Sequence, residues 1–509
     1  MGAEAPVVTH PAVLFVPFPA QGHVTPMLQL ARALAAHGVA ATVAVPDFIH
    51  RRIASATGGN GGVALASIPS GIVVPDAAGS DSDDPPGFGA IVHSMEHHMP
   101  AHLERLLVAR PAVACVVVDV LASWAVPVAA RCGVPVAGFW PAMLASYRVV
   151  AAIPELIERG LISESGTPIS SSEPSDNDDV DDQDGDPTIR GLKILPPQVK
   201  LRAEELPWLV GDSATQRSRF AFWLQTLHRA RDFRLVLVNS FPDENAADDA
   251  MHPLAIARHC PHVLPIAPAL LPGGDLATAE RTKQQRPYPS MWRADSTCIA
   301  WLDAQRAGSV VYVSFGSWVG SIGPDKVREL ALGLEATGRP FLWALRRDPS
   351  WRAGLPDGFA ARVAGRGKVV DWAPQEDVLR HGAVGCYLTH CGWNSTMEAV
   401  RHGVPLLCYP VAGDQFINCA YITGPWGIGL RIGAAMGRED VSCGIGRVMD
   451  DEDGDGGGEG RRLREKVRAL RERVVAAEAR RAADRNVRSF VDDIRRDHHP
   501  LLTQIYSVL

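Results

Sequence analysis

Short apolar runs alternate along the chain with segments in which apolar residues recur at helical spacing. The run Val13–Val16 is followed by a Pro- and Gly-containing loop that ends at His23, a helical pattern over Thr25–His37 and a second apolar run, Ala40–Val45. Short apolar runs predict buried strands, and spacings of three and four residues predict the helices that connect them. The pattern therefore predicts an α/β fold with parallel strands.

The alternation stops at a change in composition and then starts again. Residues Leu270–Ser290 are rich in Gly, Pro, Gln and charge, as interdomain linkers are, and 509 residues are too many for one hydrophobic core. We therefore predict two Rossmann-like domains, residues 1–269 and 291–485, joined by the linker 270–290. Arg461–Arg496 is a charged amphipathic helical region, and we expect the helical segment 486–509 to pack on the N-terminal domain. The other predicted elements are strands at Ala114–Val118, Val134–Phe139, Leu235–Asn239, Val310–Ser314, Phe341–Leu345, Val369–Asp371, Val384–Thr389 and Leu406–Tyr409, and a helix near Asp325–Thr337.

Acidic residues are concentrated in two stretches. Ser163–Pro187 contains nine acids and no Lys or Arg, and Asp450–Gly460 contains six acids and no base. We interpret both as solvated, disordered surface insertions, because runs of like charge repel each other and do not form a core. Calcium binding is disfavoured for Asp176–Asp186, which lacks the fixed Gly and Glu positions of a calcium loop. The formal net charge is −7, and setting aside these fifteen acids leaves +8, which is compatible with a phosphate-bearing ligand. Basic patches interleaved with aromatics are absent from the sequence, which argues against nucleic acid as a partner.

The cysteines and the apolar runs indicate the compartment. Nine cysteines occur singly, with no C-x-x-C pair, which favours a reducing environment over a disulfide framework. The start of the chain has neither the basic region nor the long apolar run of a secretory signal, and no apolar run reaches the length of a transmembrane helix. We therefore expect a cytoplasmic protein without a membrane partner, and nothing in the sequence requires more than a monomer.

The segment Val384–Tyr409 predicts a strand, a helix and a second strand, with polar residues between the first two. In such units ligands bind beyond the carboxyl ends of the strands, where helix N-termini present free N–H groups. His390, Asn394 and Ser395 would cluster there, Gly392 would allow close approach of the backbone, and Glu398 would follow one helical turn later. These residues suit a diphosphate and a ribose diol. The alternative is a helix capped by Asn394 or Ser395 with an exposed histidine, and on this stretch alone both interpretations stay open.

The surrounding residues decide between these interpretations, because they resemble the 44-residue box of plant family 1 UDP-glycosyltransferases. The box here comprises Trp372-Ala373-Pro374-Gln375, His390-Cys391-Gly392-Trp393-Asn394-Ser395, Glu398, Gly403-Val404-Pro405 and Asp414-Gln415. Pro19–His23, Leu237–Phe241, Trp301–Asp303 and Val310–Ser317 are similar to further landmarks of that family. The resemblance implies a GT-B fold, in which two Rossmann-like domains face each other across a cleft. It also implies an inverting transferase that uses a UDP-sugar and a small-molecule acceptor without a metal or other cofactor.

The resemblance also implies a role for each residue of the donor site. Trp372 would stack on uracil, and Gln375 would bind the uridine portion. The diphosphate would be held by His390, Asn394, Ser395 and Ser317, with Trp393 contributing backbone and packing. Glu398 would bind the ribose hydroxyls, while Asp414 and Gln415 would bind the sugar. In this family Gln at the last position usually accompanies glucose and His accompanies galactose, so Gln415 favours UDP-glucose.

Transfer of a sugar to a hydroxyl needs a base, and the first predicted domain offers one. Histidine suits the task because its ordinary pKa is near neutrality, and it accepts a proton best when its other nitrogen is engaged by a carboxylate. His23 follows the first strand, and Asp119 follows the apolar run Cys115–Val118. The resembling family uses a His–Asp pair at these two motif positions. The simpler alternatives are that His23 caps the following helix and that Asp119 caps a turn beside Ser123.

The acceptor site is predicted to lie in the first domain. Gly87–Met99 contains His93, and Phe139-Trp140 follows a predicted strand, so we expect these residues to line an apolar pocket for a phenolic, flavonoid, terpenoid or hormone. Zinc binding by His93 and its neighbours His97 and His98 is the weaker interpretation, since adjacent histidines are commonly polar surface.

Three other functions share parts of this sequence pattern. The first is a catalytically silent UDP-sugar sensor, which retention of His23 and Asp119 disfavours. The second is a C- or N-glycosyl-forming member of the same family, which nothing in the sequence excludes. A nicotinamide oxidoreductase is disfavoured because Pro17–His23 lacks the three-glycine turn and Gly427-x-Gly429 does not open a helix.

Overall fold

Two sets of strands form two separate parallel sheets in the computed structural model of the chain. The structure describes residues 10–54, 62–72, 86–169, 195–196, 198–241, 261–270, 291–317, 319–450 and 458–506, without the side chains of 268 and 497–506. Contacts divide the chain into one unit of residues 1–144, 225–291 and 477–509 and a second unit of residues 145–224 and 292–476. Most of the first acidic stretch, the predicted linker from 271 onward and residues 451–457 lie outside the described residues. The predicted domain boundaries stay a prediction.

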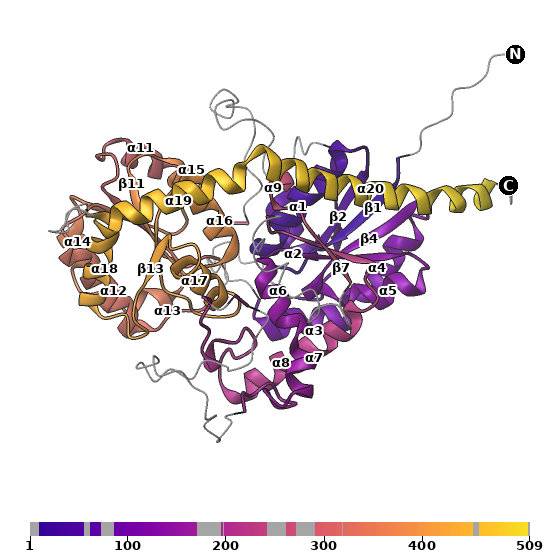
Figure 1. Ribbon diagram of the computed structural model, residues 1–509, viewed down its shortest axis with the longest axis horizontal. Helices are drawn as coiled ribbons and strands as arrows, with labels where there is room; N and C mark the ends of the chain where they lie inside the picture. Colours follow the sequence, from indigo (N-terminus) through magenta and orange to yellow (C-terminus); the bar gives the residue numbers. More distant parts are fainter. Residues whose placement is uncertain are drawn as a thin grey trace, which may run out of the picture. The chain divides into compact units, whose positions relative to one another are not determined.

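The sheet of the first unit has, among the described residues, the strand order β3-β2-β1-β4-β5-β6-β7. Figure 1 labels β1, β2, β4 and β7 of this sheet. Its strands are β1 (Ala12–Val16), β2 (Ala40–Pro46), β3 (Val63–Ile68), β4 (Val113–Asp119), β5 (Val136–Trp140), β6 (Leu235–Val238) and β7 (His262–Pro265). Strand β1 pairs in parallel with both β2 and β4. The strand order therefore reverses at β1, and the carboxyl ends of β1 and β4 form the switch point at which open α/β sheets bind ligands.

Helices complete the first unit. They are α1 (Gln21–Ala36), α2 (Asp47–Ile53), α3 (Phe88–His97), α4 (Met99–Val108), the 3₁₀ turn η2 (Val120–Ala122), α5 (Ala125–Arg131), α9 (Ala267–Leu270) and α20 (Ala477–Tyr506). The chain between β5 and β6 contains α6 (Leu144–Ala151), α7 (Ile153–Glu158), η3 (Ala203–Glu205) and α8 (Ser213–Ala230).

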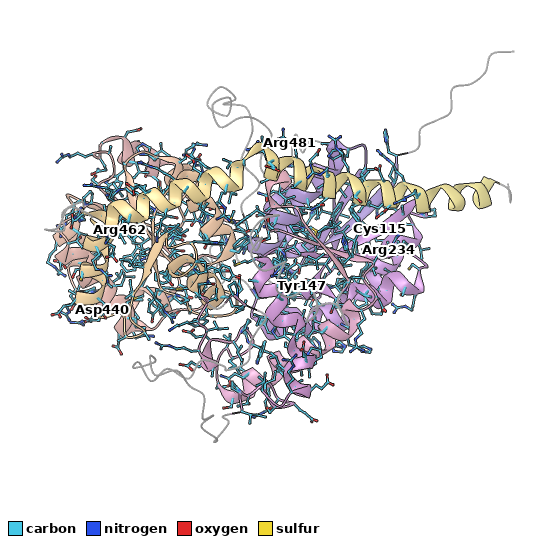
Figure 2. All side chains as sticks on the ribbon, viewed as in Figure 1. Cys115, Tyr147, Arg234, Asp440, Arg462 and Arg481 are labelled. Carbon is cyan, nitrogen blue, oxygen red and sulfur yellow. The ribbon has the colours of Figure 1, made fainter. Side chains whose placement is uncertain are left out.

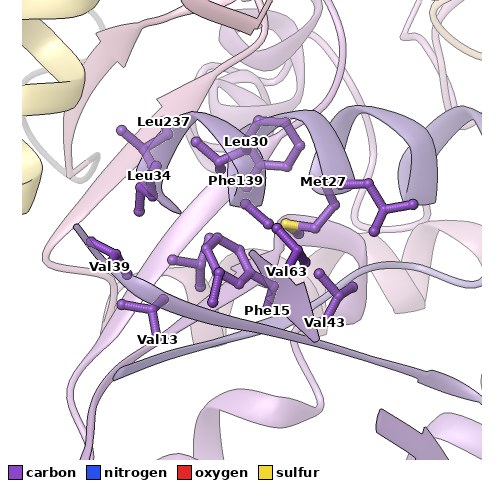
Figure 3. Packing of buried hydrophobic residues seen from close by; sticks show 14 of the residues in the cluster. Val13, Phe15, Met27, Leu30, Leu34, Val39, Val43, Val63, Phe139 and Leu237 are labelled. Carbon is purple, nitrogen blue, oxygen red and sulfur yellow. The ribbon is translucent and has the colours of Figure 1, made fainter. Parts of the chain in front are cut away.

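The core of the first unit joins residues that are far apart in the sequence. Phe15 of β1 and Leu237 of β6 pack with Leu30 and Leu34 of α1, and each of the four is fully buried (Figure 3). Burial of each such side chain stabilises the fold by about 1.5–3 kcal/mol. The same core contains four residues of α20, namely Val487, Phe490, Val491 and Ile494. The last helix is therefore part of the first unit's core.

The second unit repeats the parallel design, with the strand order β10-β9-β8-β11-β12-β13 among the described residues. Its strands are β8 (Val310–Ser314), β9 (Phe341–Ala344), β10 (Gly367–Val370), β11 (Val384–Thr389), β12 (Leu406–Cys408) and β13 (Gly429–Arg431). Its helices are α11 (Thr297–Asp303), α12 (Pro324–Ala336), α13 (Pro349–Arg352), α14 (Phe359–Val363), α15 (Gln375–Arg380), α16 (Trp393–His402), α17 (Gln415–Thr423), α18 (Arg438–Met449) and α19 (Glu459–Val475). The order reverses between β8 and β11, which pair in parallel.

The charged C-terminal region consists of two helices. Helix α19 buries Leu463, Val467 and Leu470 and exposes Arg462 on its other face (Figure 2). It ends at Val475, because the C-cap residue Ala476 has an extended conformation, and α20 begins at the next residue. In the part of the chain that the structure describes, no helix is both long and apolar enough to cross a membrane.

One boundary differs from the prediction in a way that affects the site. Helix α1 begins at Gln21 rather than at Thr25, because Ala20 takes the extended conformation of an N-cap and Pro26 is accommodated inside the helix. His23 therefore lies in the first turn of α1 rather than at the end of a loop. The prediction also omitted three short edge or near-edge strands, β3, β7 and β13.

Candidate active site

His23 and Asp119 come together at the carboxyl edge of the first sheet. His23 Nδ1 lies 2.8 Å from Asp119 Oδ2, and the Asp119 side chain is completely buried, whereas 23% of the His23 side chain is exposed. A carboxylate accepts a hydrogen bond, so this contact assigns the proton of a neutral imidazole to Nδ1. The Nε2 atom is then the nitrogen that can accept a proton.

The simpler interpretations of these two residues can be compared with the geometry. The N-cap of helix α1 is Ala20, and His23 lies inside the helix, so His23 is not the capping residue. Asp119 does cap a turn, since its Oδ1 atom accepts a hydrogen bond of 2.9 Å from the Leu121 backbone N–H. Capping uses one carboxylate oxygen and the histidine uses the other. The turn therefore fixes the orientation of the carboxylate that contacts His23.

Aromatic side chains lie beside His23. The ring of Phe18, which is buried, is 5.1 Å from the imidazole and 6.4 Å from the ring of Phe88. His93 is exposed on the same helix as Phe88 and lies 4.7 Å from the His97 ring. Phe88 belongs to the segment Gly87–Met99 that was predicted to line the acceptor pocket. Phe18 was not among the predicted pocket residues, although it lies in the loop Pro17–His23.

The two aromatic residues predicted for the acceptor pocket are placed differently. Phe139 is fully buried in the core with β1 and α1, so its side chain belongs to the packing of the sheet. Trp140, at the end of β5, is 5% exposed, and its Nε1–H donates a hydrogen bond of 3.1 Å to the Met143 carbonyl. The prediction that Phe139 lines a pocket is corrected, because residues alternate between the two faces of a strand and Phe139 faces the core.

In the second unit, His390 follows β11 and fits between two glycines. A Cβ atom at Gly316 would lie 2.7 Å from His390 Nε2, and one at Gly392 would lie 2.5 Å from the same atom. The ring is 7% exposed, and burial lowers its pKa to about 4, so the imidazole is neutral at neutral pH. Among the described atoms, its Nδ1 has no hydrogen-bond partner. A buried polar atom of this kind is suited to a ligand group.

The contact between Gly316 and His390 can be tested by substitution. Gly316 has a φ of +74°, and Gly338, which has a φ of +67° with open space around its Cβ position, is a matched control. Gly338→Ala should destabilise the protein by about 1–2 kcal/mol through backbone strain alone. Gly316→Ala should cost about 1–3 kcal/mol more, because its Cβ overlaps the imidazole. Urea unfolding measures both, and equal losses would contradict the proposed overlap.

A partly buried hydrogen-bond network joins Gln375 to four residues of the predicted donor site and its surroundings. The Gln375 Nε2 atom donates to Ser395 Oγ at 3.0 Å and to Glu398 Oε2 at 2.7 Å. Its Oε1 atom accepts hydrogen bonds from the hydroxyls of Tyr312 at 3.2 Å and Tyr387 at 3.1 Å. The side-chain amide is thus used within the protein, and Gln375 orients two neighbours of the predicted nucleotide site.

Sequence reasoning missed the two tyrosines because they stand within apolar strand runs. Tyr312 of β8 and Tyr387 of β11 are directly opposite each other in the parallel register, and their rings stack at 4.9 Å. Both are fully buried, so their hydroxyls need partners, and Gln375 supplies one acceptor for both. The signal in the sequence that could have indicated this pair was a tyrosine within each of two predicted apolar strands.

Glu398 is the most perturbed carboxyl group of this network. Burial and the nearby charge of Glu376 raise its pKa to about 7, against the opposing effect of the hydrogen bond from Gln375. A carboxyl group that titrates near neutrality beside a ligand-sized polar cluster is typical of functional sites.

The remaining predicted donor residues lie around the same sheet edge or on α17. Gln415 Oε1 accepts hydrogen bonds from the backbone N–H groups of Val411 and Ala412, at 2.9 and 3.0 Å. Asp414 Oδ2 accepts one of 2.9 Å from Asn418 Nδ2. Trp372 is partly exposed with its ring 5.7 Å from that of Trp292, and Trp393 is buried against Trp426, while Ser317 and Asn394 are partly exposed.

Two parallel α/β units, one with a carboxylate-held histidine and the other with a polar cluster at a helix N-terminus, are features of a nucleotide-sugar transferase. Residues 263–454 match the family model "UDP-glucoronosyl and UDP-glucosyl transferase". The chain is 45% identical to UDP-glycosyltransferase 82A1 of Arabidopsis thaliana, over 94% of this chain and 98% of that protein. It is 30% identical to (R)-mandelonitrile beta-glucosyltransferase of Prunus dulcis, over 92% and 93%. The chain therefore belongs to the plant UDP-glycosyltransferase family.

A solved structure supports the same assignment. UDP-glucose:anthocyanidin 3-O-glucosyltransferase in complex with UDP matches with a TM-score of 0.72 and 25% identity, covering 96% of this chain and 99% of that one. The predicted family, the GT-B fold class and the enzyme class are thus confirmed: the protein is a UDP-glycosyltransferase.

Proposed function

We propose that the protein transfers glucose from UDP-glucose to a hydroxyl of a small hydrophobic acceptor, with inversion at the anomeric carbon. The observation that carries this proposal is the contact of 2.8 Å between His23 and the buried Asp119. It supplies a base with a defined free nitrogen at the ligand-binding edge of a parallel sheet. A protein that only bound UDP-sugars would have no use for this pair.

The reaction follows from the tautomer. The acceptor hydroxyl gives its proton to His23 Nε2 while its oxygen attacks the anomeric carbon from the face opposite UDP. The bond between that carbon and the diphosphate oxygen breaks, and UDP leaves with the electron pair. Asp119 stabilises the imidazolium that forms, as buried carboxylates do in other catalytic pairs. One displacement converts an α-linked donor into a β-glucoside.

We assign the donor to the cluster in the second unit. The neutral ring of His390 would donate a hydrogen bond to the diphosphate, together with Ser317, Asn394, Ser395 and the N-terminal N–H groups of α16. Trp372 would stack on uracil. The family's usual independence of metals agrees with this design, in which fixed dipoles meet the charge of the leaving group.

The ribose is assigned to Glu398, with Gln375 as its positioning residue. The hydrogen bond of 2.7 Å from Gln375 aims the carboxylate, and the tyrosine pair holds Gln375 in turn. This role of Gln375 differs from the predicted one, in which Gln375 binds the uridine portion directly.

The ionisation of Glu398 gives this assignment a pH dependence. The carboxylate accepts from ribose hydroxyls, whereas the protonated form does so poorly. Since the pKa of Glu398 is raised to about 7, affinity should rise with pH up to about 7 and then level. Uridine, which lacks titrating phosphates, should bind about tenfold more weakly at pH 6 than at pH 8. Calorimetry measures this, Glu398→Gln should remove the dependence, and an equal slope in that variant would refute the assignment.

Glucose is proposed as the sugar and an aromatic hydroxyl compound as the acceptor. Asp414 and Gln415 would bind the sugar, and Gln415 is held by two backbone N–H groups. Two of the similar proteins bear names of glucosyltransferases, and those names refer to the aromatic acceptors anthocyanidin and mandelonitrile. The rings of Phe18 and Phe88 near His23 offer a matching apolar surface.

A screen of acceptors tests the proposed activity. Purified protein is incubated with UDP-glucose and panels of phenolic, terpenoid and hormone-type acceptors, and UDP release is measured against UDP-galactose as donor. We expect release only with an acceptor, and a higher kcat/KM for UDP-glucose. Absence of transfer across all panels, with UDP binding intact, would favour a binding protein.

We also propose a cytoplasmic, monomeric protein. The cysteines among the described residues are all free, which agrees with a reducing compartment.

A further inference from the structure

Three cysteines meet behind the predicted diphosphate loop. Cys391 follows β11, Cys408 ends β12 and Cys419 lies in α17, and all three are fully buried. Their Sγ atoms lie within 4.8 Å of one another. Among the described residues, this is the group of potential metal ligands that the fold brings together. Neither the predicted donor site nor the proposed reaction gives a role to any of the three thiols.

The spacing of the sulfur atoms suits a three-coordinate ion. An ion equidistant from three atoms that lie within 4.8 Å of one another would be at most about 2.8 Å from each. Metal–thiolate bonds are about 2.3 Å long for zinc, so each sulfur would need to move inward by at most about 0.5 Å. Small rotations of the Cys408 and Cys419 side chains, together with a small shift of the loop at Cys391, can supply this movement without a change in the strands.

Burial raises the pKa of the Cys391 and Cys408 thiols, and a nearby cation offsets part of this cost of forming thiolates. Binding of a divalent ion by three thiols releases three protons and leaves one net negative charge. Arg431, which ends β13 and is paired with Glu205 at 2.6 Å, interacts electrostatically with Cys391 and Cys419. Its guanidinium offsets part of that charge, whereas the Glu205 carboxylate acts in the opposite direction on Cys419. Sulfur ligands select soft, thiophilic ions over Mg²⁺ or Ca²⁺.

We propose that Cys391, Cys408 and Cys419 form a trigonal thiolate site for a soft divalent ion of the Zn²⁺ or Cd²⁺ type, and that its occupancy weakens donor binding. Cys391 lies between His390 and Gly392, and its φ of +65° shows how tightly this loop is constrained. Its carbonyl accepts a hydrogen bond of 2.9 Å from Asn418 Nδ2, which also donates to Asp414. Movement of the Cys391 sulfur toward an ion would therefore shift both ends of the donor site. Only the effect of the ion on donor binding rests on the proposed function.

Cadmium alone is the probe for the site. Reduced full-length protein is titrated with Cd²⁺ under anaerobic conditions, and sulfur-to-metal charge-transfer absorption and equilibrium dialysis are measured. We expect one tight Cd²⁺ that Cys408→Ala and Cys419→Ala each weaken by at least about tenfold, since loss of even an outer-shell partner costs that much. Cys386→Ala, a buried thiol outside the cluster, and Cys443→Ala, an exposed one, should leave binding unchanged.

The outcomes separate the two parts of the proposal. Absence of charge-transfer absorption, or binding that Cys443→Ala removes and Cys408→Ala does not, overturns the site. Cys408→Ser serves as a second variant, with its thermal unfolding compared with that of the unsubstituted protein, so that misfolding is recognised. Cd²⁺ binding that leaves UDP affinity unchanged overturns the coupling. Cd²⁺ binding by a protein without any transfer activity refutes the proposed function and leaves the ion site standing.

Discussion

Replacing His23 by alanine should lower kcat for glucosyl transfer by about 10²–10⁴-fold, the usual contribution of a positioned general base. UDP affinity should stay unchanged, because the proposed donor residues all belong to the second unit. Alanine removes the only nitrogen that the Asp119 contact prepares for proton transfer. Steady-state kinetics with UDP-glucose and a phenolic acceptor measures the first effect, and calorimetry with UDP measures the second.

The first unit contains a matched control for this substitution. His37, at the other end of α1, also contacts a carboxylate, with Nε2 at 3.1 Å from Asp484 Oδ1. His37→Ala removes an imidazole of the same helix that has no place in the proposed reaction, so turnover should be retained. Near-normal turnover in His23→Ala, or an equal loss in His37→Ala, would show that His23 is not the base.

The Asp119→Asn substitution should cost nearly as much. The oxygen of the substituted side-chain amide can still accept the hydrogen bond from Leu121, so the turn after β4 should persist. An amide N–H facing His23 would, however, move the imidazole proton to Nε2 and remove the base. An Asp-to-Asn change in a serine protease triad lowers kcat by about 10⁴-fold for this reason, and we expect a loss of about 10³–10⁴-fold here.

Two measurements distinguish this tautomer effect from general damage. Asp484→Asn is the matched control, because it alters the corresponding partner of His37. The double variant His23→Ala/Asp119→Asn should be no slower than His23→Ala alone, since residues that act as one unit are not additive. Additive losses would mean that Asp119 acts independently of His23.

The buried centre of each sheet was predictable from the sequence, whereas three of the four edge strands of the described sheets, β3, β7 and β13, were not predicted. The strands Val310–Ser314 and Val384–Thr389 were predicted with the bounds that the structure shows, because continuous apolar runs are characteristic of central parallel strands. The strand Val63–Ile68 lies at an edge, and its mixture of buried and exposed residues gives a weaker signal. Gly429–Arg431 is only three residues long, too short for a periodic pattern.

The candidate site was predictable where strand ends determine it. His23 and Asp119 follow strands that prove to be neighbours, so their approach follows from the topology. The tyrosine pair depends on the relative register of β8 and β11, which no local pattern reveals. Phe139 was predicted to line the pocket but is buried in the core. Alternate residues near the end of a strand lie in the core and at the ligand edge, and the sequence alone does not say which is which.

The configuration of the product distinguishes a single displacement by the acceptor oxygen from a double displacement. The glycoside formed from UDP-glucose and a phenolic acceptor is isolated, and its anomeric proton coupling is measured by NMR. We expect the large coupling of a β-glucoside, formed by a single displacement in which His23 accepts the proton. Formation of an α-glucoside would refute this mechanism, because retention requires a second displacement and the proposed site has no nucleophile for it.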